Sequence, residues 1–163
     1  MSNASLAGSS TDEMQIKAML QRYFYALDAR DREVLETCFA EDVEVQYHTG
    51  TAGQFTQNSA RSIVDYLIDN MQNYKARTHV GANMHVWVAG NTATSVTHAV
   101  ATLLKGERLV IRGLRYTDEH TKIAGEWRIS RRKHQPLWQY EATPMQPDIP
   151  APALKLAAAQ ARK

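Results

Sequence analysis

The chain has 163 residues, a formal net charge of +2, and 44% hydrophobic and 22% charged residues. This length and composition are typical of one globular domain that buries a core of its own. A net charge this small, without a dense basic stripe, argues against nucleic acid or an anionic membrane as a partner. The single cysteine, Cys38, excludes an internal disulfide and argues against a cysteine-rich zinc site.

The ends of the chain carry few structural signals. Residues 1–10 are small and polar, and we expect them to be a disordered segment or residues added for expression. The start lacks the basic and apolar segments of a secretory signal, and no apolar run is long enough to cross a bilayer. The cytoplasm is the expected location.

The first half of the chain reads as helical. Thr11 and Asp12 can cap a helix, and apolar residues then recur at helical spacing. Asp31 and Ser59 can cap two more helices. The pattern therefore predicts, in chain order, a helix over 11–27, a short helix over 31–39, a strand over 43–47, a loop over 48–58 and a helix over 59–71.

The second half reads as β-structure. Four long segments rich in β-formers are separated by turn signals at Gly90-Asn91, Lys105-Gly106 and Ala124-Gly125. Three helices followed by an antiparallel meander predict an α+β fold, with helices on one face of a curved sheet. A sheet this long coils into a cone around a pocket. We expect this domain to span 11–141, followed by a proline-rich arm over 142–163 that ends in a short helix.

Two polar residues are candidates for proton transfer. Asp28 lies near a helix C-terminus, where the helix dipole and burial would favour its protonated form, as a general base near neutral pH requires. The alternative for Asp28 is a structural role, in which it ends the helix and forms an ion pair in solvent with Arg30 or Arg32. His79 shares a strand face with Gly81, opposite Val80, and a bulge could exchange the two faces. Alternation therefore leaves open whether His79 lines the pocket.

Further polar residues can line the same pocket. Tyr23 and Tyr47 can donate hydrogen bonds to a substrate oxygen, although large aromatic residues at such positions are often core. Arg112, Arg132 and His134 lie in the last two predicted strands. If they point inward they suit an anionic group, and if outward they protect a sheet edge. The six histidines have no metal-ligand spacing, so we expect no metal site.

The motifs resemble a known family. Similarity to SnoaL-like domains of the NTF2-like superfamily covers about residues 11–140 and is carried by the runs Tyr25–Asp31, Leu35–Val43, Thr78–Asn83, Tyr116–Glu119 and Trp127–Arg132. Within that superfamily the sequence is most similar to the scytalone dehydratase, hexachlorocyclohexane dehydrochlorinase and bile-acid dehydratase group. The resemblance implies an NTF2-like cone and elimination chemistry without a cofactor.

The resemblance also implies roles for individual residues. Asp28 and His79 match the catalytic Asp and His, and Arg132 matches an arginine of the dehydrochlorinase. Tyr47 matches a pocket tyrosine of scytalone dehydratase. With Tyr23, Arg112, His134 and Tyr116, it is expected to contact the substrate. His79 would then take a proton from carbon while Asp28 holds its other ring nitrogen.

At two positions this sequence differs from the enzymes it resembles, and the differences narrow the expected reaction. Tyr23 stands where the dehydrochlorinase has lysine, and His98 is displaced from the second histidine of scytalone dehydratase. Dehydration or isomerisation of a small cyclic or polycyclic substrate is therefore favoured over dehydrochlorination.

Two alternative functions remain open at this point. One is a non-catalytic ligand-binding or assembly domain, related to the small subunits of ring-hydroxylating dioxygenases. The other is a ketosteroid-isomerase or polyketide-cyclase type of enzyme, which uses an inward carboxylate as its base. The late strands show no obvious second inward acid, which counts against the isomerase arrangement.

An association between copies of the chain is also expected. If His79 faces the pocket, the opposite strand face carries Val80, Met84, Val86 and Val88, which are apolar enough to pair with another subunit. We expect a homo-oligomer, either a dimer or a trimer, with the proline-rich arm as a possible clasp.

Overall fold

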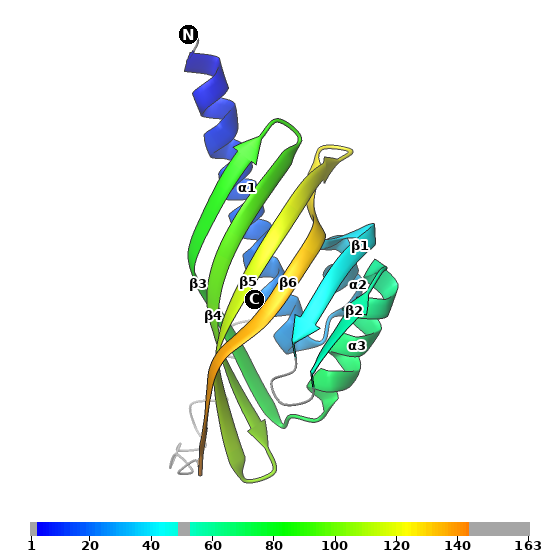
Figure 1. Cartoon of the computed structure of the whole chain (residues 1–163), viewed down its shortest axis with the longest axis vertical. Helices are drawn as coiled ribbons and strands as arrows, with labels where there is room; N and C mark the ends of the chain where they lie inside the picture. The colour runs from blue at the N-terminus through cyan, green and yellow to red at the C-terminus, as the bar shows by residue number, and fades with distance from the viewer. Residues whose placement is uncertain (1–2, 49–52, 144–163) are drawn as a thin grey trace, which may run out of the picture.

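The computed structural model describes residues 3–48 and 53–143, with side chains from Ser10 onward. Figure 1 shows a long helix lying beside a curved sheet, with the shorter helices grouped near one edge. The helices are α1 (Asn3–Ala29), α2 (Arg32–Thr37) and α3 (Ala60–Gln72). The strands are β1 (Phe39–His48), β2 (Gln54–Gln57), β3 (Ala76–Ala89), β4 (Thr92–Lys105), β5 (Arg108–Ile123) and β6 (Glu126–Ala142).

Helix α1 is longer than its cap signal predicts. Residues 3–10 are helical, where we expected disorder, so the cap predicted at Thr11 is wrong. Adding residues to an existing helix is far easier than nucleating a new one, which explains the extension. The helix ends in a Schellman turn, in which Arg30 has a φ of 56° and Asp31 N–H donates to the Ala26 carbonyl at 2.8 Å. This turn leaves Asp28 in the last helical turn.

The other two helices begin at their predicted caps. Asp31 accepts a hydrogen bond from the backbone N–H of Val34, and Ser59 accepts one from that of Ser62, each at 3.1 Å. Helix α2, however, ends at Thr37, because Phe39 pairs with Ile129 at the start of β1. Pairing with the sheet therefore shortens the helix predicted over 31–39.

The six strands form one sheet in the order β2-β1-β6-β5-β4-β3. Strands β3 to β6 make the predicted antiparallel meander, whereas β1 pairs with β6 in parallel. The segment predicted as a loop over 48–58 contains β2, which pairs antiparallel with β1. The sequence did not predict this edge strand, because its residues are mostly polar and show no apolar alternation. Backbone pairing with β1 forms it. The arm predicted over 142–163 lies outside the described residues from 144 onward.

A bulge in β3 decides which side chains face the helices. The pairing with β4 shifts between Ala82 and His85, and Asn83 has a φ of 49°. His79 and Gly81 pair with the inward residues Ala101 and Ala99, so they face inward. Beyond the bulge Met84, Val86 and Val88 turn inward and pack on the core. The prediction that Met84, Val86 and Val88 lie on the outer face is therefore wrong, and of the four apolar residues predicted there only Val80 faces outward, with 58% of its surface exposed.

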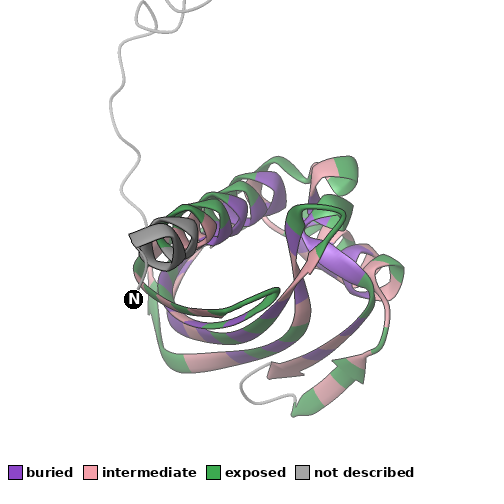
Figure 2. Cartoon of the chain, turned by 90° about the horizontal axis from the view of Figure 1, so that it is seen from above, coloured by how far each residue is buried: buried purple, intermediate pink, exposed green. Residues whose placement is uncertain are grey.

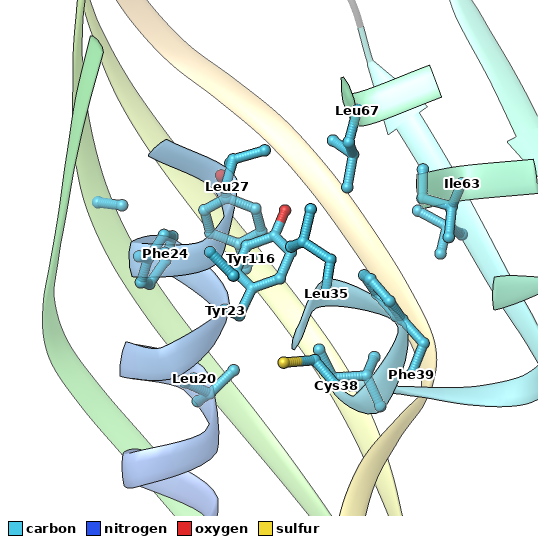
Figure 3. Packing of buried hydrophobic residues seen from close by; sticks show 14 of the residues in the cluster. Leu20, Tyr23, Phe24, Leu27, Leu35, Cys38, Phe39, Ile63, Leu67 and Tyr116 are labelled. Carbon is cyan, nitrogen blue, oxygen red and sulfur yellow. The ribbon is translucent and has the colours of Figure 1, made fainter. Parts of the chain in front are cut away.

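The helices cover the concave side of the sheet. Figure 2 shows the sheet curving around an interior that α1 spans. The buried stripe of α1 is the one predicted, and it packs on α2, α3 and the sheet through Ile16, Met19, Leu20, Tyr23, Phe24 and Leu27. Figure 3 shows four of these residues, Leu20, Tyr23, Phe24 and Leu27, on the side of α1 that faces Tyr116 of β5. The α+β fold class is confirmed. No helix of the described part of the chain is long and apolar enough to cross a membrane.

Candidate functional site

Asp28 and His79, 51 residues apart in the chain, meet where the end of α1 crosses the start of β3. The Nδ1 atom of His79 lies 2.6 Å from Oδ1 of Asp28, and the backbone N–H of His79 donates to Oδ2 at 2.7 Å. The side chain of His79 is 4% exposed and that of Asp28 is 23% exposed. Both carboxylate oxygens bind the same residue, so the position and the ring orientation of His79 are fixed together.

This contact also sets the tautomer of His79. A carboxylate can only accept a hydrogen bond, so Nδ1 of the neutral imidazole carries the proton and Nε2 carries the lone pair. Among the described residues, no group bonds Nε2. The ring of Phe24 lies nearly parallel to the imidazole, at 14° with centroids 6.4 Å apart. The free nitrogen of His79 is therefore a proton acceptor beside an apolar wall.

A residue that sequence reasoning missed, Arg77, holds the backbone around this pair. Its Nε–H donates to the Asp28 carbonyl at 2.7 Å, and its Nη1 donates to the carbonyl of Tyr74 at 3.0 Å and to that of Met71 at 3.5 Å. Arg77 thus joins the C-terminal ends of α1 and α3, where helix carbonyls lack partners and a cation is favourable. It lies two residues before His79 on β3.

Arg132 points inward but is engaged by a carboxylate. Its Nε and Nη2 donate to the two oxygens of Asp118 at 2.8 and 2.7 Å, and both residues are 1% exposed. The guanidinium lies 4.3 Å from the ring centroid of Tyr23 and 4.7 Å from that of Tyr116. Its Nη1 is buried without a partner among the described residues. Arg132 therefore forms a bidentate buried ion pair between aromatic rings.

Asp118 is the inward acid of the late strands that sequence reasoning did not find. Strands β5 and β6 form a hairpin in which Ile123 pairs with Glu126, and a regular register from this pair onward would place Asp118 opposite Arg131. The register instead shifts by one residue between His120 and Glu119, so Asp118 pairs with Arg132. The expectation of no second inward acid is therefore wrong, although Arg132 occupies both oxygens of this carboxylate.

Tyr23 and Tyr116 pack between the guanidinium of Arg132 and the ring of Phe24, which in turn lies beside His79. Both are 1% exposed, and each ring packs edge-on against Phe24, at centroid distances of 5.3 Å and 5.5 Å. Burial raises the pKa of both hydroxyl groups above its usual range. Both tyrosines therefore stay protonated and can act as hydrogen-bond donors.

The other three predicted substrate contacts gather at a cavity. Tyr47, Arg112 and His134 line a space of about 160 Å³ between β1, α3, β5 and β6. The imidazole of His134 stacks on Tyr47, with centroids 3.9 Å apart and an angle of 10°. Arg112 occupies the same cross-strand row as His79, since both pair with Ala101 from opposite sides. The cavity therefore lies on the inner face of the sheet.

A further polar pair joins β4 and β5. Ser95 Oγ is 2.8 Å from Nε2 of His120, and each residue is 1% exposed. Burial lowers the pKa of His120 to about 4, so the imidazole is neutral near physiological pH. No group of three or more histidine, cysteine or acidic side chains suited to a metal ion occurs within residues 3–48 and 53–143.

Comparison with solved structures identifies the fold. A provisionally assigned scytalone dehydratase from Novosphingobium aromaticivorans superposes with a TM-score of 0.72 at 21% identity, covering 83% of this chain and 90% of that one. A hexachlorocyclohexane dehydrochlorinase from Novosphingobium barchaimii gives 0.72 at 16% identity, covering 86% and 96%. At these identities the likeness shows a shared fold.

Sequence comparison agrees with this fold. An uncharacterised protein of Mycobacterium tuberculosis is 28% identical over 134 residues, which cover 79% of this chain and 88% of that protein. The family model described as a SnoaL-like domain matches residues 8–133. The chain therefore belongs to the SnoaL-like domain family, as its motifs predicted.

Proposed function

We propose that the protein is a cofactor-independent lyase or isomerase that acts on a small cyclic or polycyclic substrate, with His79 as its general base. The observation that carries this proposal is the double contact of Asp28 with His79, at 2.6 and 2.7 Å. The contact leaves Nε2 as the proton acceptor and gives Asp28 the orienting role of a triad carboxylate. A non-catalytic binding domain would have no need to orient a buried histidine in this way.

The proposed reaction begins at a carbon next to a carbonyl group. Nε2 of His79 takes the proton, and the electrons of the broken C–H bond form an enolate. Hydrogen bonds from Tyr23 or Tyr116 would stabilise the oxygen on which negative charge develops. Asp28 stabilises the imidazolium that forms at the same time.

The enolate can then react in two ways. In dehydration its electrons form a carbon–carbon double bond as the C–O bond of a β-hydroxyl breaks, and the proton on His79 leaves with the hydroxide as water. In isomerisation the same proton returns to a different carbon of the conjugated system. We favour dehydration, because the solved relatives include a provisionally assigned dehydratase and a dehydrochlorinase, both named for eliminations.

Deuterium incorporation tests the proton-transfer step without knowledge of the natural substrate. In heavy water, the wild-type protein is expected to exchange the α-proton of β-hydroxycyclohexanone, or of a bicyclic analogue, and to eliminate water from it. His79→Ala removes the base and should abolish exchange. Asp28→Leu keeps the base but removes its positioning, and it should slow exchange by roughly 100-fold or more, since a positioned base contributes at least a factor of this size. Full exchange by His79→Ala would overturn the proposal. Arg131→Gln, which alters an exposed side chain paired with Glu119, serves as the matched control.

A further inference from the structure

The cavity between β1, α3, β5 and β6 has the size of a single ring. A volume of about 160 Å³ exceeds that of the roughly 150 Å³ engineered cavity that accepts benzene. Aromatic side chains of Tyr47, Tyr66 and Tyr74 line it. Tyr47 and Tyr66 meet edge-to-face with centroids 5.2 Å apart, so these walls are rigid and flat. The space fits one six-membered ring with small substituents.

Arg112 gives this cavity an unmatched positive charge. Its Nε donates to Oε1 of Gln139 at 2.8 Å, and Nε2 of Gln139 in turn donates to Glu141 at 3.2 Å. Glu141 is itself paired with Arg108 at 2.6 Å. The direct partner of Arg112 is therefore a neutral amide, and no carboxylate of the described residues pairs with it. Arg132, in contrast, is neutralised by Asp118.

His134 adds a hydrogen-bond acceptor beside this charge. Its Nδ1 lies 3.1 Å from the carbonyl oxygen of His48, and because a carbonyl only accepts, Nδ1 carries the proton. Burial and the nearby charge of Arg132 lower the pKa of His134 to about 3, so its ring is neutral. Stacking on Tyr47 holds the ring in place. Its Nε2 therefore presents a lone pair that no donor among the described residues meets.

We propose that this cavity binds a substrate ring that carries a carboxylate for Arg112 and a hydroxyl group for Nε2 of His134. This inference rests on the proposed function, because the ring in the cavity is the part of the substrate that stays bound while His79 takes a proton from another part. The shared row His79–Ala101–Arg112 spans two strand spacings, about 10 Å. A ring held by Arg112 therefore leaves the reacting carbon outside the cavity, toward His79. The substrate is an aromatic hydroxy acid extended by a second ring or a side chain.

Calorimetric titration of the full chain with meta-hydroxybenzoate tests this subsite. Two analogues remove one group each: benzoate lacks the hydroxyl group, and meta-hydroxybenzyl alcohol lacks the charge. Loss of the charge is expected to weaken binding by roughly 10- to 100-fold and loss of the hydroxyl group by about 2- to 10-fold, the usual range for charged and neutral hydrogen bonds. Equal affinity for all three compounds, or no binding of meta-hydroxybenzoate, would overturn the subsite.

Two variants assign the two groups of the ligand to their partners. Arg112→Gln should reduce the affinity for meta-hydroxybenzoate to that of the uncharged alcohol, and His134→Phe should keep the stacking but remove the preference for the hydroxyl group. Arg115→Gln is the matched control, because Arg115 bonds Gln135 and does not line the cavity. Circular dichroism verifies that each variant is folded. Unchanged selectivity in both cavity variants contradicts the inference.

The binding experiment tests the subsite and the exchange experiment tests the proposed reaction, so a negative result in one does not decide the other. Titration does not require turnover, so absent charge selectivity overturns the subsite even if His79 exchanges protons. Charge-selective binding without exchange dependent on His79 overturns the proposed reaction and leaves the subsite standing.

Discussion

The buried ion pair of Arg132 and Asp118 offers a direct test of why Arg132 faces the interior. Each residue is 1% exposed, and two hydrogen bonds of 2.8 and 2.7 Å join them. Asp118→Leu would leave the guanidinium buried between Tyr23 and Tyr116 without its counter-ion. The rings can compensate only in part, because a cation–π contact is worth about 2 kcal/mol even when desolvated.

The expected cost follows from this geometry. Removing one partner of a buried pair lowers the free energy of unfolding by about 3–5 kcal/mol. For a chain of this length each kcal/mol shifts the melting temperature by about 2–4 °C, so the shift is roughly 6–20 °C. Replacing both residues, as in Asp118→Leu with Arg132→Met, restores most of this loss because no uncompensated charge remains.

Urea unfolding of the wild type, both single variants and the double variant forms the required double-mutant cycle. We expect a coupling of several kcal/mol, with the double variant more stable than Asp118→Leu alone. Additive losses, or a loss below about 1 kcal/mol in Asp118→Leu, would refute the assignment of Arg132 to a buried ion pair.

Three other predictions follow from the packing and the protonation states. Gly81→Ala should cost about 1–3 kcal/mol, because an added Cβ would lie 2.8 Å from Cδ2 of Phe24; a thermal melt equal to the wild type contradicts this. Arg77→Met should speed hydrogen exchange in the last turns of α1 and α3, and unchanged exchange there would show that Arg77 does not hold them. The pKa values of His120 and His134 fall from 6.5 to about 4 and about 3 on folding, so the unfolded chain binds more protons below pH 6.5. The free energy of unfolding therefore falls as the pH drops from 6.5 toward 4, by about 3 kcal/mol for His120 alone. Urea unfolding at a series of pH values should show this loss, and His120→Leu should remove the part of the loss that His120 causes.

The sequence predicts the parts of the fold that depend on local patterns. The stripe of α1, the caps at Asp31 and Ser59, and the meander all follow from spacing and turn residues. Strand β2 does not, because its only support is pairing with β1.

The candidate site was predictable only in part. Resemblance, rather than spacing, singled out Asp28 and His79, because the bulge near Asn83 decides which face His79 occupies. The same limit hid Asp118, whose partner depends on a register shift in the last hairpin. Arg77 gave no signal either, because its partners are backbone carbonyl groups. Local patterns specify elements, whereas bulges and backbone contacts specify which side chains meet.

The most direct test of the central claim is the tautomer of His79, measured by heteronuclear NMR of its ring nitrogens in the neutral state. If Asp28 orients the base, the proton resides on Nδ1 and Nε2 is unprotonated, and Asp28→Leu removes this preference. A proton on Nε2 in the wild-type protein would contradict the account, because the nitrogen assigned to take the substrate proton would already carry one.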